Sequence, residues 1–484
     1  MQRLVIQRIL GLLLMIFSIS MLPPLLVGYY YNEPEVLKTF GIAFLATLAT
    51  GFILWQPIRK QHAEMRLRDG FIVVVMFWTV LGAFGTLPFL LSNAVNVSFI
   101  DSLFESISGL TTTGATVLSD LDQLPRSILF YRQQLQWLGG MGIIVLAVAV
   151  LPMLGVGGMQ LYRAETPGPV KDSKLTPRIT ETAKALWYIY LLLTILCTLS
   201  YWGAGMSVFD AVSHSFSTIA IGGFSTHDAN IAYFDSAAIE WVAIVFMIIS
   251  GANFGLHFLA WRNRSLLYYF RDAEFKMYIS VLVAVSLMTV ACLYVYQTHN
   301  HWFHPITKAV FQVVSIGTTT GFTSENFSAW PAFLPLLLIM LSFMGGCAGS
   351  TGGGMKVIRV LLLFKQGARE LKRLVHPSGQ FAVKLGKKPV ENRVIEAVWG
   401  FLSAYIAVFV VMLILLSASG LDQVSAYSAV AATLNNLGPG LGEVAQNYAS
   451  INWFSKSVLC LGMLLGRLEI FTLLVLLTPY FWRR

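Results

Sequence analysis

A short segment recurs four times in this chain, and it restricts the possible folds more than any other feature. Each copy is a semi-polar, helix-like run that ends in a glycine turn and lies between two long apolar stretches. In every copy the residue that opens the run stands thirteen positions before the glycine. A chain with four such hairpins can build a fourfold pore by itself. The copies are DSLFESISGLTTTGAT, DAVSHSFSTIAIGGFST, KAVFQVVSIGTTTGFTS and SAYSAVAATLNNLGPGL, with turns at Gly114, Gly223, Gly321 and Gly438.

Composition places the chain in a membrane. Of its 484 residues, 56% are hydrophobic and only 12% are charged, which is too little charge to cover a soluble protein of this size. Ten apolar stretches reach the roughly 20 residues that a helix needs to cross a bilayer. We therefore predict an all-α polytopic membrane protein with ten transmembrane helices. The stretches are residues 9–31, 36–56, 70–92, 128–158, 183–204, 236–261, 277–296, 332–362, 394–417 and 453–481.

The four glycine segments are too short and too polar to cross. We expect them to be re-entrant pore loops that are buried in protein. After the first two helices the order helix, loop, helix occurs four times, so the repeats face one way and surround one pore with fourfold pseudo-symmetry. The expected units are a peripheral two-helix unit at residues 1–56 and pore repeats at 57–165, 166–270, 271–385 and 386–484.

Basic residues fix the expected orientation. With ten spans both termini share one side, and most of the 33 Lys and Arg residues lie on that side, so the termini are expected in the cytoplasm. A long basic connector, LKRLVHPSGQFAVKLGKKPVENR, is either a loop near anionic lipid or a docking surface for a soluble partner. Acidic residues on the outer side either attract cations or are ordinary loop residues. They include Asp120, Asp122, Asp210, Asp228, Asp235, Glu325, Asp422 and Glu443.

The glycine turns have the chemistry of a cation filter. A cation that loses its water needs replacement oxygens, and backbone carbonyls supply them where glycine tolerates a strained chain. Helices that aim their negative C-terminal ends at the pore add to this effect. The alternative is close packing of glycine-rich helices. The predicted ion-binding residues are Thr111, Thr112, Thr113, Gly114, Ala220, Ile221, Gly222, Gly223, Thr318, Thr319, Thr320, Gly321, Asn435, Asn436, Leu437 and Gly438.

The four copies are not identical. Only the first and third contain TTTG, and Pro439 follows the glycine of the fourth. We therefore expect one or two ion levels and softer discrimination among monovalent cations than a TVGYG-type filter gives. The expected N-caps of the short helices are Asp101, Ser102, Asp210, Thr307 and Ser425, with Ser102 and Glu105 as a capping box.

A glycine-rich stretch in the helix after the third turn, SFMGGCAGSTGGGMK, is a candidate gate. No stable helix is expected there, and irregular backbone at membrane depth must line a cavity or be packed in protein. We interpret it as a mobile flap beneath the filter. The alternatives are a packing kink and a phosphate loop, which would need a Gly-Lys-Ser/Thr ending. Its glycines are Gly345, Gly346, Gly349, Gly352, Gly353 and Gly354.

Arg467 lies deep in the last apolar stretch. A buried arginine in a membrane usually faces a cavity or a partner. We expect Arg467 to face the pore, where it would repel cations or bind carbonyls of the flap. The alternative is a structural pair with Glu469, although residues two apart on a helix point to different faces.

Five motifs carry a resemblance to a known family. The chain is similar over essentially its whole length to the TrkH/KtrB superfamily of potassium transporters, through TTTGAT, AIGGFST, TTTGFTS, GGCAGSTGGGMK and LLGRLEIF. The resemblance implies potassium uptake across the bacterial cell inner membrane, with K⁺ bound at the filter residues. It also implies a homodimer in membrane lipid, a cytosolic TrkA-type nucleotide-binding regulatory subunit, and a gate made of residues 345–354 and Arg467. No organic cofactor and no nucleic acid are expected.

Two other functions stay open at this point. A proton- or sodium-coupled potassium symporter would need a second ion site, and Glu105 and Glu469 are the candidates for a buried proton relay. A membrane-embedded enzyme would need a metal cluster or a nucleophile triad, and the sequence contains no such pattern. We therefore do not expect an enzyme.

Overall fold

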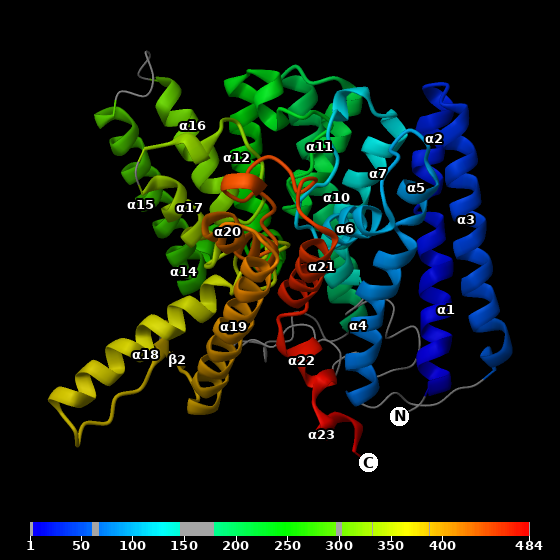
Figure 1. The fold of residues 1–484 in the computed structure, drawn as a ribbon. Coiled ribbons are helices and arrows are strands. Elements are labelled where there is room, and N and C mark those ends of the chain that lie inside the picture. Colours follow the sequence, from blue (N-terminus) through cyan, green and yellow to red (C-terminus); the bar gives the residue numbers. More distant parts are fainter. Residues whose placement is uncertain are drawn as a thin grey trace.

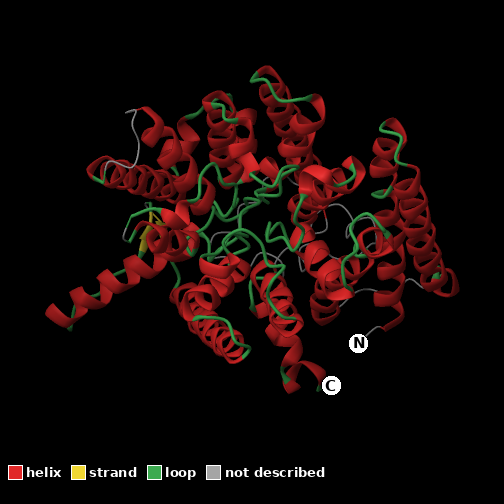
Figure 2. Cartoon of the chain, turned by 45° about the horizontal axis from the view of Figure 1, so that its top comes forward, coloured by secondary structure: helices red, strands yellow, loops and turns green. Residues whose placement is uncertain are grey.

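The long helices of the chain stand side by side around a centre of loops (Figures 1 and 2). The chain is mostly helical, as predicted, and its one sheet in the described part is a hairpin that pairs Lys384 with Pro389 and Leu385 with Lys388. α1 begins and α23 ends at the lower end of Figure 1. The computed structural model describes residues 3–60, 67–145, 179–296, 303–331, 333–386 and 388–483.

The first unit is a helix pair at one edge of the molecule (Figure 1). Its first span combines α1 (Arg3–Ile19) and α2 (Leu22–Tyr30), and its second contains α3 (Pro34–Trp55). α1 and α3 cross where Gly11 and Gly51 meet, because a Cβ on either glycine would overlap the backbone of the other helix. The unit packs against the first pore repeat through α4 (Leu67–Phe84) and α7 (Arg126–Val145).

Six spans are long and apolar enough to cross a membrane in the described part of the chain. Two further candidates are sharply bent: α12 (Ala237–Gly251) meets α13 (Phe254–Arg262) at 91°, and α21 (Trp453–Arg467) meets α22 (Phe471–Leu477) at 115°. The described helices thus account for six to eight of the ten predicted spans. The six are Arg3–Tyr30, Pro34–Ile58, Arg68–Leu91, Lys184–Gly203, Ala273–Val295 and Asn392–Ala418.

The other two predicted stretches have different outcomes. α7 covers the first part of residues 128–158, and residues 146–158 lie outside the described residues. Residues 332–362 do not form one helix, because the glycine-rich stretch separates α17 (Leu334–Ser342) from α18 (Val357–Val375). This break follows from the poor helix propensity of glycine. α18 then projects from the body of the molecule (Figure 1).

The four glycine segments begin with short helices, which we call pore helices. They are α6 (Phe99–Leu110), α11 (Val208–Ala220), α16 (Phe303–Gly317) and α20 (Gln423–Leu434). Each contacts the helix that follows the glycine turn of the preceding repeat: α11 contacts α7, α16 contacts α12, α20 contacts α17, and α6 contacts α21. The last contact closes a circle, and Figure 2 shows the loops gathered inside it.

The predicted N-caps of the pore helices are wrong. The caps are Ser98 for α6, Ser207 for α11 and Asp422 for α20, whose side chains accept backbone N–H groups of the first turn. In α6 and α11 the cap serine also donates a hydrogen bond to the aspartate three residues later, so this Ser/Asp pair acts as a capping box. The five predicted caps lie within the helices: Asp101, Ser102, Asp210, Thr307 and Ser425.

The remaining elements connect these parts. The longest are α10, which precedes the second pore helix, α15, which precedes the third, and α19, which precedes the fourth. Their bounds, with those of the shorter elements, are η1 (Gln56–Ile58), α5 (Leu87–Leu91), η2 (Leu121–Gln123), α10 (Ile179–Gly203), η4 (Asn230–Phe234), α14 (Leu267–Arg271), α15 (Ala273–Val295), η5 (Phe327–Ala329), β1 (Lys384–Leu385), β2 (Lys388–Pro389), α19 (Asn392–Ala418), η6 (Gly442–Val444) and α23 (Pro479–Trp482).

Candidate ion pathway

All four pore helices end in the same backbone pattern. In each, the N–H of the residue before the glycine donates to the carbonyl five residues earlier, at 2.7 to 2.8 Å. The residue two before each glycine has a left-handed φ between 52° and 68°, although none of the four is a glycine. This is a Schellman ending. The four residues with this conformation are Thr112, Ile221, Thr319 and Asn436.

The four turn glycines form a closed ring. Their φ values lie between 79° and 97°, a region that favours glycine. A Cβ on each would also lie within 3.0 Å of the carbonyl oxygen that precedes the glycine of the next segment. Space and backbone conformation therefore both require glycine here. The contacts run from Gly114 to Gly222, from Gly223 to Thr320, from Gly321 to Leu437, and from Gly438 back to Thr113.

Side chains stiffen the segments in different ways. In segments one and three, two threonine hydroxyls hydrogen-bond each other: Thr111 with Thr113 at 2.8 Å, and Thr318 with Thr320 at 2.7 Å. In segment four, the Asn436 amide donates to the Thr113 hydroxyl at 2.9 Å. Asn435 donates to a serine of α17, Ser342, at 2.9 Å.

The predicted filter residues are buried, except for Gly114, which is partly exposed. On one side of the ring lies a cavity of about 460 Å³ that all four turn glycines line. We call it the vestibule. Two of the predicted outer acids, Asp228 and Glu325, also line it, together with the basic groups of Arg132 and His227.

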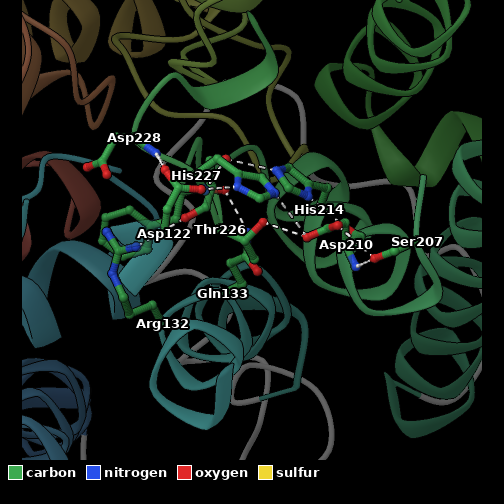
Figure 3. A network of polar contacts seen from close by, with 11 residues as sticks. Asp122, Arg132, Gln133, Ser207, Asp210, His214, Thr226, His227 and Asp228 are labelled. Carbon is green, nitrogen blue, oxygen red and sulfur yellow. Dashed lines mark hydrogen bonds and ion pairs between the residues drawn. The ribbon is translucent and has the colours of Figure 1, made fainter. Parts of the chain in front are cut away.

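His227 joins the loops that follow segments one and two (Figure 3). Its ring forms ion pairs with Asp122, which lies after segment one, and with Asp210 at 3.4 Å, and it stacks on Tyr233 at 3.5 Å. Burial lowers the pKa of His227, but hydrogen bonds and the charges of Asp210 and Asp122 outweigh burial and raise the pKa above its ordinary value. Asp122 and Asp210, which the sequence offered as acids that attract cations, thus form ion pairs with His227.

Side chains of helix α7 donate hydrogen bonds to backbone carbonyls of segment two. Arg132 donates to Glu105 at 2.7 Å and to the Ser225 carbonyl at 3.1 Å, and Gln133 donates to the Phe224 carbonyl at 3.0 Å. Glu105 is thus the partner of a buried arginine, not a member of the predicted capping box. The sequence signal that could have found these residues is the polar run RQQLQ inside a predicted span.

The flap, residues 345–354, lies against the ring. The N–H of Gly353 donates to the Thr319 hydroxyl at 2.7 Å, and the N–H of Gly354 donates to the Asn435 carbonyl at 3.0 Å. The Thr351 hydroxyl donates to the Ile219 carbonyl at 2.9 Å. The flap therefore contacts segments three and four and the end of the second pore helix.

Two residues that the sequence did not point to hold the flap from the side. The buried carboxylate of Glu274 accepts the N–H groups of Ala348 at 2.7 Å and Ile358 at 3.1 Å. At the break between α12 and α13, the N–H of Phe254 donates to the Gly349 carbonyl at 3.1 Å. An acidic residue at the start of an apolar helix is the only sequence signal for Glu274.

Arg467 is the last residue of α21 and stands where the final span bends, rather than deep within a helix. Its guanidinium donates to the Thr351 carbonyl of the flap at 3.1 Å and to the Gly139 carbonyl of α7 at 2.9 Å. Glu469 pairs instead with Arg359 of α18. The expected contact with flap carbonyls is present, and Glu469 has a different partner from the one that the alternative assumed.

A small cavity of about 30 Å³ lies between the flap and the bend after α21. Arg467, Lys356 and Asn436 line it. Asn436 belongs to segment four and Gly438 of the same segment lines the vestibule, so both cavities border segment four. Both candidates for a proton relay are in ion pairs, Glu105 with Arg132 and Glu469 with Arg359.

Comparison with known proteins identifies the family. The TrkH family, described as cation transport proteins, matches residues 37–483. The chain is 57% identical to the Trk system potassium uptake protein TrkH of Salmonella typhimurium, over 99% of both chains. It is 40% identical to the Escherichia coli protein TrkG, over 99% of this chain and 98% of that one.

A solved structure agrees with this result. The crystal structure of the potassium transporter TrkH from Vibrio parahaemolyticus superposes with a TM-score of 0.92 at 55% sequence identity, and the match covers 100% of both chains. The resemblance that the motifs carried is therefore confirmed. The chain belongs to the TrkH family of cation transport proteins.

Proposed function

We propose that this protein takes up potassium across the bacterial cell inner membrane through a gated, channel-like pore. The observation that carries the proposal is the closed ring of Gly114, Gly223, Gly321 and Gly438. Relatives along the whole chain are named potassium uptake proteins, which supports K⁺ as the transported ion. In this proposal the four repeats surround the pore as the sequence predicts, and both termini lie in the cytoplasm.

The ring acts as the selectivity filter. Carbonyl oxygens of the segments that end at the four glycines replace the water of a dehydrated K⁺. The C-terminal ends of the pore helices add partial negative charge. The filter is short. It has one or two levels of ion-binding sites, because only segments one and three share the TTTG pattern and Pro439 follows the turn glycine of segment four.

The flap and Arg467 act as the gate. The flap contacts the ring, and Arg467 holds one of its carbonyls. A fixed positive charge in a low-dielectric path opposes cation entry. Lys356 adds a second one, since its ammonium group donates to the Gly352 carbonyl of the flap. K⁺ passes when the flap leaves the ring.

The proposed oligomeric state and regulatory partner are those that the family resemblance implies. The protein works as a homodimer in the lipid bilayer, with a cytosolic TrkA-type nucleotide-binding subunit that controls the flap. The coupling element is α18, which starts at Val357, three residues after the flap. The N–H of Val357 donates to the Gly346 carbonyl at 3.1 Å, so a displacement of α18 by a partner pulls on the flap directly.

The experiment uses purified protein in lipid vesicles with a K⁺ gradient. Rb⁺ and Na⁺ fluxes are measured with and without the nucleotide-binding partner. We expect Rb⁺ flux well above Na⁺ flux and a dependence on the partner. A symporter is the alternative: the reversal potential would then shift with pH or with the Na⁺ gradient, and such a shift would replace the channel mechanism by a coupled one.

A further inference from the structure

Segment two is the one member of the ring without a polar side chain at its filter positions. Its residues Ala220, Ile221, Gly222 and Gly223 have no hydroxyl or amide group, whereas threonine pairs or asparagines stiffen the other three segments. Ile221 nevertheless adopts a left-handed φ of 54°. That conformation is unfavourable for a β-branched residue, so segment two needs support from elsewhere.

The support comes from Gln136 of α7. Its amide nitrogen donates to the Gly222 carbonyl at 2.5 Å, and its amide oxygen accepts the N–H of Phe224 at 3.1 Å. Both groups of one side chain thus hold the backbone on either side of Gly223. Gln136 is completely buried, so water cannot take over these bonds.

The Gln136 amide also occupies the space of a missing side chain. A Cβ on Gly222 would overlap this amide. Gly222 is the residue before the turn glycine, and the residues at that position in segments one and three are Thr113 and Thr320, whose hydroxyls bond within their own segments. In segment two the side chain is absent from the segment, and a helix of the neighbouring repeat supplies the polar group.

We propose that Gln136 is a positioning residue for the filter: it fixes the Gly222 carbonyl in the ring and thereby sets the preference for K⁺ over Na⁺. This inference rests on the proposed filter function. Gly222 O lies against Gly114 of segment one, so a shift of this one carbonyl changes the width of the ring between two repeats. Arg132 and Gln133 hold the next residues, Ser225 and Phe224, and keep the loop in place when Gln136 is altered.

The test measures the Rb⁺ to Na⁺ flux ratio of purified protein in vesicles. Gln136→Leu removes both hydrogen bonds, and we expect the ratio to fall about tenfold, as the loss of a hydrogen bond of typical strength predicts. Gln134→Leu is the matched control, because Gln134 lies two residues away on α7 and donates instead to the Ser20 carbonyl at 2.8 Å. Its ratio should equal that of the wild type.

Three further variants keep the test decisive. Gln136→Met keeps the length of the side chain but lacks the amide donor and acceptor that hold Gly222 and Phe224, so its ratio should also fall; it decides the question if Gln136→Leu does not insert. Gly222→Ser should be strongly impaired by the clash with Gln136, and Gly222→Ser combined with Gln136→Ala should recover part of the flux because space returns.

The outcomes separate this inference from the proposed function. A wild-type Rb⁺ to Na⁺ ratio in Gln136→Leu or Gln136→Met overturns the role of Gln136 and leaves the filter intact. Equal Rb⁺ and Na⁺ fluxes in the wild type and in the Gln134→Leu control overturn the filter itself, and the role of Gln136 falls with it.

Discussion

The ring and the flap are both rich in glycine and both irregular, yet they are held in opposite ways. The ring repeats one pattern four times, with the same backbone hydrogen bond and the same left-handed residues in every segment. The flap is held by single contacts from Glu274, Thr319 and Arg467. Glycine allows close approach in both, since a Cβ on Gly353 of the flap would lie 2.0 Å from the Asn435 carbonyl oxygen, and in the flap it also prevents a helix. In the function we propose, the repeated pattern suits the fixed filter and the separate contacts suit the part that is released.

The largest expected effect is on the ring. Gly321→Ser places a side chain on a residue with φ of 83° and against the Leu437 carbonyl. The strain is about 1–3 kcal/mol, so we expect roughly a tenfold or greater loss of K⁺ uptake or of K⁺ over Na⁺ preference. Rb⁺ and Na⁺ fluxes in vesicles measure it. The control is Gly41→Ala, since Gly41 has open space around it. Unchanged affinity and selectivity in Gly321→Ser would mean that the ring is not the filter.

The fourfold ring could be predicted from sequence because its signal is local. A glycine at a fixed distance after a helix-like run is visible in each copy, and the backbone ending follows from it. The N-caps of the first two pore helices lie three residues before the predicted Asp101 and Asp210, because these aspartates accept hydrogen bonds from the true caps, Ser98 and Ser207. Serine and aspartate are both good caps, so composition alone does not choose between them.

The supports of the site could not be predicted in this way. Gln136 and Glu274 act on residues that are 86 and 74 positions away in the chain, and no local pattern records such contacts. The bends at Ala252 and after Arg467 were also missed, because hydropathy continues across them. Arg467 was noticed only because a charge in an apolar stretch is rare.

The next effect concerns the flap. Arg467→Ala removes the bond to the Thr351 carbonyl and a positive charge beside the path, so we expect higher basal K⁺ flux and weaker dependence on a partner. Arg467→Lys should be intermediate, because it keeps the charge and loses the planar donor fork. Flux in vesicles at matched protein amounts measures both, with the exposed Arg271→Ala as control. A folded Arg467→Ala protein with normal or lower flux would contradict the gate.

A smaller effect is expected from the side support of the flap. Glu274→Ala leaves the N–H groups of Ala348 and Ile358 without their shared acceptor. Because each bond to a carboxylate contributes about 1.5–3 kcal/mol, the flap should detach more often and basal flux should rise, though less than in Arg467→Ala, which also removes a charge. Glu396→Ala on the exposed face of α19 is the control. If Glu274→Ala leaves the flux of a folded protein unchanged, this carboxylate does not restrain the flap.

The smallest expected effect is a pH dependence at the outer loops of the ring. Asp210 and Asp122 raise the pKa of His227 above its ordinary value despite burial. A raised pKa in the folded state means that the contribution of His227 to stability is fully present below the unfolded pKa, about 6.5. The contribution is lost as the pH rises through the folded pKa. Thermal unfolding of the purified protein across this range should show a stability that declines with rising pH.

The variant His227→Gln removes the titrating group that joins the loops after segments one and two. Its unfolding temperature should be lower than that of the wild type at acidic pH and should change less with pH. His376→Gln is the matched control, because His376 is exposed near the end of α18, far along the chain from the vestibule loops. If the wild type and His227→Gln have parallel pH profiles, the pair of acids does not use a charged His227 to tie these loops together, and the outer side of the ring is held by α7 instead.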